Sequence, residues 1–524
     1  MPSYAQIYSV SFTFHSQHTA LSKNYIVSKA LNYFELEKQI AQTTHLKNII
    51  SLAHWDVATM LAKGSAASRQ QEIATVASVL HKMITTKEVG NLISAALHEE
   101  SILDEWQKAN LNAIKKVYDE ANCISPEMQR EYSIATGECE FVWRAARKKN
   151  DFKQLVPHLD RVFDIVRNIA LIKATHFDKQ PYDTLIDAHS PDLTSHSIKV
   201  IYTVLKSELP GLIQEIVAKQ ASEKVIPLTK KIDEATQKAI NLRIIENMGF
   251  SLDHGRLDTS AHPFCSGSND DVRLTTRYEE DNFLSSLTGT IHEVGHGLYQ
   301  QNLPQAYRDQ PVGGPKGMSF HESQSIIMER QACTSIAFTD FLAALLRDEF
   351  GLQGKEYGAE NLYKLLTRVT PSLIRVDADE VTYPLHVILR FEIEEALIEG
   401  SIKANDLPEL WNTKMKAYLG ITPKTDEVGC MQDIHWPSGQ LGYFPAYANG
   451  AIIASMLMQA ARKKYPMMEA ALRRGNFDIL NTFLTENLRK FGAMKSSSDL
   501  LAGATGHTKI EPTIFIEYLK KKYL

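Results

Sequence analysis

Two histidines and a glutamate stand within the short segment His292-Glu293-Val294-Gly295-His296. In an α-helix, positions i and i+4 lie one turn apart on the same face, so both imidazole rings can reach one metal ion. Glu293 lies about 100° around the helix, where its carboxylate can contact a metal-held water without binding the metal. A zinc ion lowers the pKa of such a water to about 7, and the glutamate can pass its proton to a leaving amine. The spacing therefore predicts peptide hydrolysis at a zinc centre.

A helix is the expected carrier of this motif. Residues 282–299 have apolar side chains at helical spacing, and the pattern ends before Pro304. Gly295 and Gly297 each cost about 1 kcal/mol relative to alanine inside a helix, which suggests that something packs very close to this backbone. The alternative interpretation is a buried helix whose two histidines are hydrogen-bonded and bind no metal.

The third metal ligand must come from another element, because catalytic zinc usually has three protein ligands and one open position. Glu322 is our candidate, since it stands near the start of the next helical pattern, beyond a Gly/Pro-rich surface loop over 302–318. Two alternatives are that Glu322 only caps this helix and that His321 is the ligand. Glu329, on the same helix face as Glu322, is either a partner of a ligand histidine or a solvated side chain.

The elements around this site are expected to be mainly helical. Residues 25–246 form a succession of helical patterns with charged faces. Residues 249–278 are rich in Gly, Asp, Ser and Pro around short β-leaning pieces, which predicts a small hairpin or sheet beside the metal helix, and helices resume after Tyr299. The predicted organisation is a tail over 1–24 and one helical domain over 25–524, with a helical half (25–248) and a zinc-binding half (249–524).

Composition excludes several other classes of protein. The 524-residue chain has 57 basic and 62 acidic side chains and a net charge of -5, so it has no basic surplus to attract nucleic acid. No apolar run reaches the roughly 18 residues of a membrane span, and the first residues lack the features of a secretory signal. Five cysteines without C-x-x-C spacing argue against a disulfide framework and a thiolate zinc site. We therefore expect a cytoplasmic protein.

Several further motifs accompany the metal motif in a fixed order between about Gly255 and Asn449. With them, the chain resembles the carboxypeptidase Taq family, zinc metallocarboxypeptidases of the HExxH type, and the helical N-terminal half with Trp55-Asp56 looks similar as well. The resemblance implies a large helical subunit with a deep central groove, a homodimer, and release of single C-terminal residues from peptides with broad preference. The motifs are HPF, DVRLTT, HEVGH, HESQS, IRVDADE and CMQDIHW.

Carried over by position, the resemblance makes His292, His296 and Glu322 the ligands of one Zn²⁺ per subunit, with Co²⁺ as the alternative metal. It makes Glu293 the general base. The chain departs from the family pattern in two places. Ile326 follows HESQS where the family often has arginine, and the residues up to Lys23 look like an extra tail.

A carboxypeptidase also needs a cation for the terminal carboxylate of its substrate, and a guanidinium can pair with both oxygens. Arg375 in IRVDADE is our candidate, and the alternative is a structural ion pair with Asp377 or Asp379. Arg273 in DVRLTT is the rival, although a strand arginine paired with Asp271 or Glu279 is more typical of a structural role.

Hydrolysis passes through an oxyanion, which the metal can share with a donor from a histidine or tyrosine. The Gly/Pro-rich stretch 429–450 supplies His435, Tyr443 and Tyr447. We assign His435 and Tyr443 to the transition state and Tyr447 to substrate binding, the alternative for each tyrosine being a packed ring with a satisfied hydroxyl. The leading hypothesis is a zinc carboxypeptidase that acts on peptides with a free C-terminus. The alternatives are an oligopeptidase or dipeptidase of similar helical type, and a non-catalytic metal- or peptide-binding protein.

Overall fold

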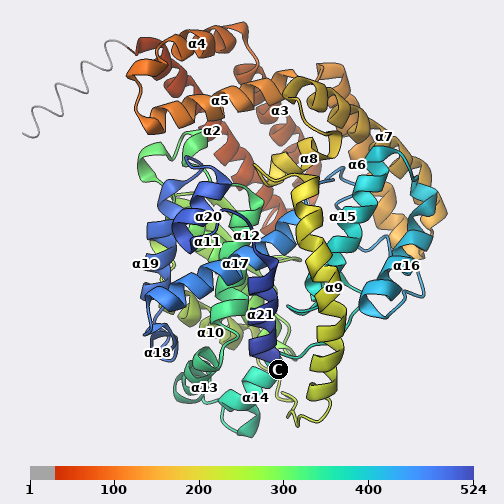
Figure 1. Cartoon of the computed structure of the whole chain (residues 1–524), viewed down its shortest axis with the longest axis vertical. Helices are drawn as coiled ribbons and strands as arrows, with labels where there is room; N and C mark the ends of the chain where they lie inside the picture. Colours follow the sequence, from red (N-terminus) through yellow and green to blue (C-terminus); the bar gives the residue numbers. More distant parts are fainter. Residues whose placement is uncertain (1–29) are drawn as a thin grey trace, which may run out of the picture. The chain divides into compact units, whose positions relative to one another are not determined.

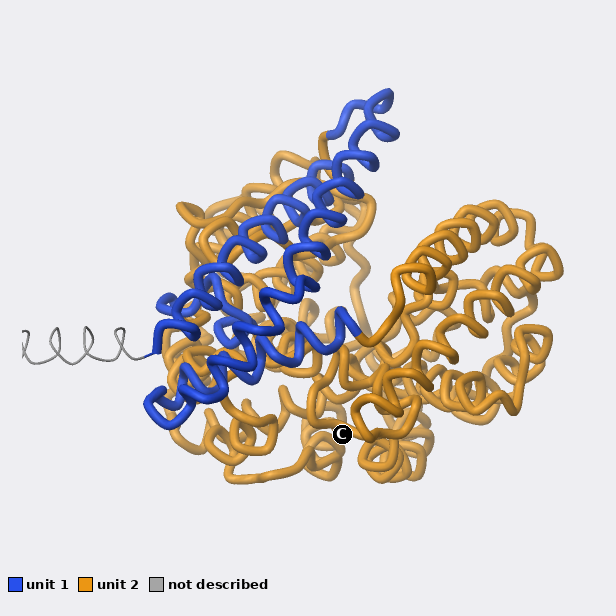
Figure 2. Tube along the Cα trace, turned by 90° about the horizontal axis from the view of Figure 1, so that it is seen from above, with its two compact units in different colours: residues 1–57, 61–122, 305–314 blue, residues 58–60, 123–304, 315–524 orange. Residues whose placement is uncertain are grey.

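The computed structural model describes residues 30–524, which are mainly α-helical with one small sheet (Figure 1). The tail predicted over 1–24 lies outside the described residues. Contacts along the chain define two compact units (Figure 2). Unit 1 contains residues up to Val57, Leu61–Asn122 and Gln305–Gly314, and unit 2 contains the remainder. The single domain expected over 25–524 therefore stays a prediction, and the unit boundaries fall away from its expected midpoint near residue 248.

Unit 1 is built from helices with a small apolar core of its own. Tyr33 and Leu36 of the first helix are fully buried in it, together with apolar residues of the following helices. The segment 305–314, expected to lie in a surface loop, is instead packed into this unit. There Gln310 accepts a hydrogen bond from the amide of Asn110 at 3.0 Å, and Val312 is fully buried. The helices are α2 (Leu31–Thr59), α3 (Ala66–Ile84), α4 (Lys87–His98) and α5 (Glu105–Asn122).

Unit 2 carries most of the helices, and their ends follow local sequence signals. Thr194 and Ser197 form a capping box that starts α9, and Gly400 ends α15 in a left-handed conformation with φ 77°. Within the described residues 30–246, the predicted helical character is confirmed, since the helices of that half run from Leu31 to Asn247. The helices of unit 2 are α6 (Pro126–Lys149), α7 (Phe152–Phe177), α8 (Pro181–His189), α9 (Ser195–Gln220), α10 (Glu234–Asn247), α11 (Phe283–Gln301), α12 (Met318–Ile326), α13 (Ile336–Phe350), α14 (Ala359–Leu366), α15 (Tyr383–Glu399), α16 (Leu407–Leu419), α17 (Pro445–Lys464), α18 (Met468–Leu472), α19 (Asp478–Asn487), α20 (Ser497–Thr505) and α21 (Pro512–Tyr523).

The predicted small sheet lies against the metal-motif helix α11. Its strands are β1 (Gly255–Thr259), β2 (Cys265–Ser268) and β3 (Asp271–Thr276), in the order β1-β3-β2. Strand β2 pairs antiparallel with β3, and β1 pairs parallel with it. Val272 and Leu274 alternate along β3 on one face and are fully buried, and β3 packs on α11. The sheet thus supports the helix that carries the metal motif.

Two glycines allow the helices around the metal motif to approach closely. A Cβ on Gly295 of α11 would stand 2.5 Å from the Cα of Ser325 in α12 and would collide with the carbonyl of Gln324. A Cβ on Gly450 of α17 would stand 2.7 Å from the Cβ of Glu322. The close packing expected from the glycines of the motif is therefore confirmed, and α12 lies between α11 and α17.

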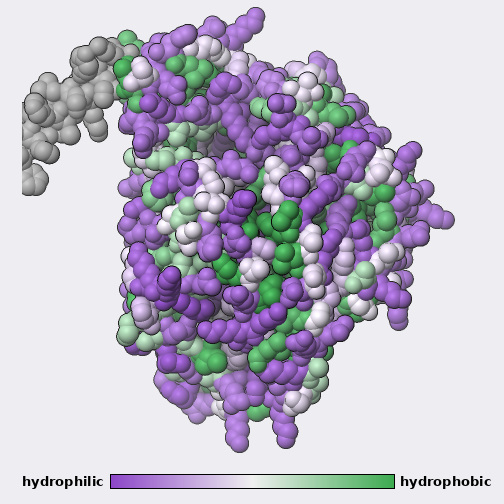
Figure 3. Space-filling view, in the orientation of Figure 1, coloured by the Kyte–Doolittle hydropathy of each residue, from purple (hydrophilic) through white to green (hydrophobic). Residues whose placement is uncertain are grey.

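The surface is mostly polar. On the face drawn in Figure 3, hydrophilic side chains predominate and smaller hydrophobic areas lie between them. Among residues 30–524, every helix is too short or too polar to cross a lipid bilayer.

Candidate metal centre

The three predicted ligands converge on one point in unit 2. Ligand atoms of His292, His296 and Glu322 all lie within 4.8 Å of one another. The Nε2 atoms of His292 and His296 are 3.9 and 3.6 Å from the two carboxylate oxygens of Glu322. Bonds of about 2.0–2.2 Å to a tetrahedral zinc ion place neighbouring ligand atoms about 3.3–3.6 Å apart, so a small contraction would complete the site. The nitrogen and oxygen donor set also suits zinc.

The second nitrogen of each ligand histidine is held by a neighbour. Nδ1 of His292 is 2.9 Å from a carboxylate oxygen of Glu329, and Nδ1 of His296 is 3.1 Å from the carbonyl oxygen of His321. In a neutral ring, an Nδ1–H donated to one of these oxygens leaves Nε2 free to bind a metal. Nδ1 of His296 also lies 2.6 Å from Nδ1 of His321. Glu329 is thus a partner of a ligand rather than a solvated side chain. His321, the competing ligand, contacts Nδ1 of His296, and it is not part of the group in which ligand atoms of His292, His296 and Glu322 converge.

The charges around this point favour a cation. Burial would lower the pKa of His292, but the carboxylates of Glu322 and Glu329 raise it to about 10. Burial raises the pKa of Glu322, and it raises the pKa of Glu293 to about 7 with help from the neighbouring carboxylates. Three buried carboxylates, those of Glu293, Glu322 and Glu329, therefore lie close enough around the two histidines to repel one another. A divalent ion would relieve their repulsion and would lower the pKa of Glu293 in doing so.

Glu329 reaches His292 from an unusual backbone segment. The pattern over 321–338 predicts one continuous helix, but the structure has α12 up to Ile326, a π-helical segment η6 (Ile327–Ala332) and a new helix α13. Ser335 caps α13 by accepting a hydrogen bond from the backbone N–H of Phe338 at 3.1 Å. Hydrophobic spacing alone does not reveal the extra residue of a π-helical turn, which widens the helix locally.

Arg375 lies in a buried cluster of charged groups. It donates hydrogen bonds to Asp433, the shortest at 2.8 Å, and another of 2.9 Å to the hydroxyl of Tyr383. Its ion pair is therefore with Asp433 rather than with Asp377 or Asp379. Arg390, which is fully buried, binds the second oxygen of Asp433 at 2.6 Å. Two guanidinium groups on one carboxylate leave a net positive charge.

The predicted oxyanion and substrate residues gather beside this cluster. The ring of Tyr447 is 5.1 Å from the guanidinium carbon of Arg375, and the rings of Tyr443 and Tyr447 are 5.3 Å apart. The ring of His435 is 5.6 Å from that of Tyr443. Burial raises the pKa of Tyr443 to about 12, and the nearby carboxylate of Glu322 adds to the shift. The structure thus brings His435, Tyr443, Tyr447 and Arg375 into one neighbourhood next to a metal ligand.

Burial fixes the protonation states in this neighbourhood. Burial, together with the nearby charge of Arg375, lowers the pKa of His435 to about 3. His435 is therefore neutral at pH 7, with one N–H to donate. Burial alone would raise the pKa of Asp433, but Arg390 and Arg375 hold it well below its usual value. Asp433 is therefore a permanent anion.

Sequence reasoning missed three members of this neighbourhood. The first is Tyr383, whose hydroxyl accepts a hydrogen bond from Arg375 and whose ring is 6.0 Å from that of Tyr447. The second is Arg390, which binds Asp433. The third is His189, whose ring is 4.9 Å from that of Tyr443. An arginine inside the apolar stretch that forms α15 was a usable signal for Arg390, because a buried cation needs a partner. Nothing in the spacing of Tyr383 or His189 marks them.

The rival cation has a structural role. Arg273 donates three hydrogen bonds to the carboxylate of Asp271 on the same strand, at 2.9 to 3.1 Å. This is the pairing expected of an arginine whose function is structural. Of the two arginines considered from the sequence, Arg375 is the buried one.

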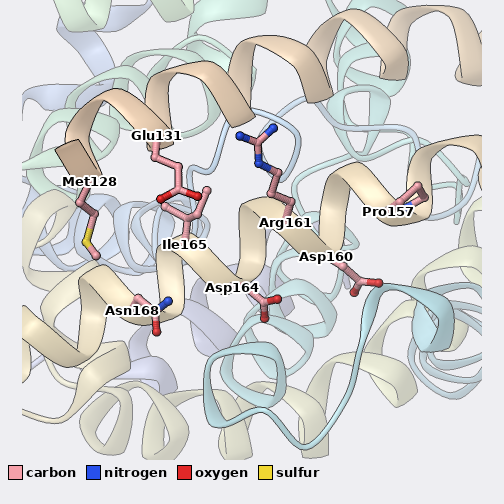
Figure 4. Close-up of a pocket in the computed structure, with 8 residues that line it drawn as sticks. All are labelled: Met128, Glu131, Pro157, Asp160, Arg161, Asp164, Ile165 and Asn168. Atoms are coloured by element: carbon pink, nitrogen blue, oxygen red, sulfur yellow. The ribbon is translucent and has the colours of Figure 1, made fainter.

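A separate hollow lies between α6 and α7, with a volume of about 530 Å³ (Figure 4). Two of its charged side chains form ion pairs, Arg161 with Glu138 at 2.7 Å and Asp164 with Arg167 at 2.9 Å. None of the residues that line it belongs to the metal centre. They are Met128, Glu131, Pro157, Asp160, Arg161, Asp164, Ile165 and Asn168.

A helical protein whose HExxH helix and following glutamate share one metal centre has the make-up of a metallopeptidase. The family model described as carboxypeptidase Taq (M32) metallopeptidase matches residues 35–523. Carboxypeptidase 1 of Bacillus subtilis is 33% identical over 492 residues, which cover 94% of this chain and 97% of that protein. Thermostable carboxypeptidase 1 of Thermus thermophilus is 32% identical over 502 residues, 94% of this chain and 98% of that protein.

Solved structures agree with these relatives. Metallocarboxypeptidase 1 of Trypanosoma cruzi superposes with a TM-score of 0.92 at 35% identity, covering 94% of this chain and 99% of that one. The M32 carboxypeptidase of Deinococcus radiodurans has a TM-score of 0.90 at 30% identity with the same coverage. The chain therefore belongs to the carboxypeptidase Taq (M32) family and is a metallocarboxypeptidase.

Proposed function

We propose that this enzyme is a zinc-dependent carboxypeptidase that releases single residues from the free C-terminus of peptides, with broad preference for the residue released. The observation that carries the proposal is the convergence of His292, His296 and Glu322, whose ligand atoms lie within 4.8 Å of one another. When bound, the metal would polarise the scissile carbonyl and make a water more acidic.

In this proposal Glu293 acts as the general base. Its carboxylate is one residue from His292 and buried, with a pKa raised by burial to about 7, so it can accept a proton from water and return it to the leaving amine. The neutral imidazole of His435 or the hydroxyl of Tyr443 donates to the developing oxyanion.

The terminal carboxylate of the substrate is bound by Arg375 in this proposal. Hydrogen bonds to Asp433 and Tyr383 use three of its five N–H groups. The net positive charge shared by Arg375, Arg390 and Asp433 supports anion binding, and Tyr447 packs beside it.

A deep groove for the peptide, a homodimer and a cytoplasmic location belong to the same proposal and are supported by the resemblance and the composition. The net charge of -5 argues against nucleic acid as a partner, and no membrane partner is proposed.

The class of reaction is tested by measuring bound metal and released C-terminal residues together. We expect both to fall on chelation and to recover together when zinc is added back, and activity that survives complete metal removal would refute the proposal. A peptide with a C-terminal amide should resist cleavage, because Arg375 then has no carboxylate to bind. Cleavage of amidated and free peptides at equal rates would instead favour an oligopeptidase.

The role of the base is tested by Glu293→Gln. This variant should keep its zinc, because Glu293 is not a ligand, and should lose at least about 100-fold in kcat, as expected for removal of a general base. Metal content by atomic absorption serves as the control for intact ligands. Unchanged turnover would remove Glu293 from the mechanism.

A further inference from the structure

The orientation of the ligand His292 depends on a residue of the π-helical segment η6. One carboxylate oxygen of Glu329 is 2.9 Å from Nδ1 of His292, and the other is 2.9 Å from Nε of Arg330. Glu329 is 7% exposed, so water does not compete strongly for either contact. The direction in which Nε2 of His292 points is therefore set by the backbone that carries Glu329.

That backbone is held at its C-terminal end by the helix α21. In the last turn of a helix the carbonyl groups need partners from outside it. The carbonyl oxygen of Arg330 accepts hydrogen bonds from Nζ of Lys522 at 2.7 Å and from the hydroxyl of Tyr518 at 3.1 Å, in addition to a local one from the hydroxyl of Thr334 at 2.6 Å. An ammonium group at the C-terminal end of a helix is also favoured by the helix dipole.

Lys522 is itself fixed in place. Its Nζ donates to the carboxylate of Glu380 at 2.7 Å and to the hydroxyl of Thr334 at 2.7 Å. With the carbonyl of Arg330 and the hydroxyl of Tyr518 at 2.9 Å, four acceptors surround the three donors of this ammonium group. The side chains of Lys522 and Glu380 are 9% and 3% exposed, so this pair is buried as well as hydrogen-bonded. A residue more than 190 positions away in sequence thus fixes the end of η6.

We propose that Lys522 is a positioning residue for the metal centre. Lys522 binds the carbonyl of Arg330 and thereby keeps η6 in the conformation that directs Glu329 to His292. Tyr518, one turn earlier on α21, supports the same carbonyl. The proposal rests on the proposed metal site, and it adds a residue of α21 to the groups that determine metal affinity.

The test is the zinc dissociation constant of Lys522→Met, measured by competition with a chromogenic chelator. Methionine keeps an unbranched apolar side chain and removes the donors. We expect the constant to rise about tenfold, within the range found when partners of ligand side chains are removed. Lys520→Met is the matched control, because Lys520 lies on the same helix and forms only an exposed ion pair with Glu208 at 3.0 Å. It should bind zinc as the wild type does.

A general loss of stability must be separated from a loss of positioning. Glu380→Gln also breaks the buried ion pair, yet it leaves Lys522 free to donate to Arg330, so we expect it to lower the melting temperature while changing zinc affinity less than twofold. Equal losses of zinc affinity in the two variants would overturn the proposal, as would an unchanged constant in folded Lys522→Met.

If Lys522→Met does not fold, Tyr518→Phe decides the question, because it keeps the ion pair and removes only a hydroxyl. The single proton of that hydroxyl is shared between Arg330 and Glu380, and its oxygen accepts from Lys522. A measurable rise in its zinc dissociation constant supports the proposal, and no rise overturns it. A wild-type protein that binds no zinc would defeat the proposed function. Wild-type binding with unaffected variants would defeat only the role of Lys522.

Discussion

At the scale of single residues, the site depends on buried charges whose partners are each fixed by a particular contact. Asp433 neutralises part of the charge of Arg375 and Arg390, which are 6% and 0% exposed in their side chains. Removing one partner of a buried ion pair leaves an uncompensated charge, at a cost of about 3–5 kcal/mol. The position of Arg375 beside Tyr447 therefore depends on the carboxylate of Asp433.

Asp433→Asn should lower the free energy of unfolding at neutral pH by about 3–5 kcal/mol. The native pKa of Asp433 is held below its unfolded value, so its ionised form stabilises the native state fully above about pH 4. Below that pH the stabilisation decreases by about 1.4 kcal/mol per pH unit until the native pKa is reached. Urea unfolding from pH 8 to pH 3 measures the difference between the two proteins.

Asp377→Asn is the control for this experiment, because Asp377 is exposed and lies two residues from Arg375. It should differ little from the wild type at any pH. A constant difference between Asp433→Asn and the wild type down to pH 3 would contradict the assigned charge of Asp433.

Local spacing was sufficient to predict that the two histidines of the motif point in one direction, and it was insufficient to predict the neighbours of the proposed metal centre. His292 and His296 are one helical turn apart, so their common direction follows from helix geometry alone. The contacts of Tyr383 with Arg375 and of Arg390 with Asp433 join segments whose approach depends on tertiary packing. The periodicity of the sequence does not predict which of these distant segments pack together.

At the scale of elements, the centre requires α11 and α12 to lie almost in backbone contact. Gly295 makes this possible, because any side chain there would meet the backbone of Gln324 and Ser325. The helix and the close approach were predictable from the glycines of the motif. The π-helical turn that follows α12 was not, since it changes the course of the helix without changing its apolar composition.

Gly295→Ala should destabilise the protein by about 1–3 kcal/mol through overpacking and should weaken zinc binding, because α12 with Glu322 is displaced from α11. Gly289→Ala on the same helix is the control. Its Cβ would meet only Pro263, at an ordinary contact distance of 3.6 Å, and the gain in helix propensity of up to about 1 kcal/mol should leave stability unchanged or higher. Thermal unfolding and zinc titration of both variants test this prediction. Equal melting temperatures and equal zinc affinities in the two variants would contradict it.

At the scale of the whole molecule, all three proposed metal ligands belong to unit 2, and the helices that carry them are joined through segment 305–314 of unit 1. Along the chain, α11 is followed by this segment, which belongs to unit 1, and then by α12, which belongs to unit 2. Neither the division into two units nor the assignment of segment 305–314 to unit 1 was predictable, because the loop over 302–318 has the Gly and Pro content of an ordinary surface connection. Its burial depends on Gln310 and Val312 finding partners far away in sequence.

A metal that joins α11 to α12 should stabilise the native state of unit 2 by mass action. A ligand at 100 times its dissociation constant adds about 2.7 kcal/mol if it does not bind the unfolded chain. Calorimetry should therefore show an upward shift of the unfolding transition with zinc in the wild type and in Glu293→Gln, which keeps all three ligands. Glu322→Ala should lose the shift, because the remaining two histidines lie on α11 alone and the metal then no longer links α11 to α12. If the units unfold in separate transitions, only that of unit 2 should respond, and an equal shift in Glu322→Ala would show that zinc binds elsewhere.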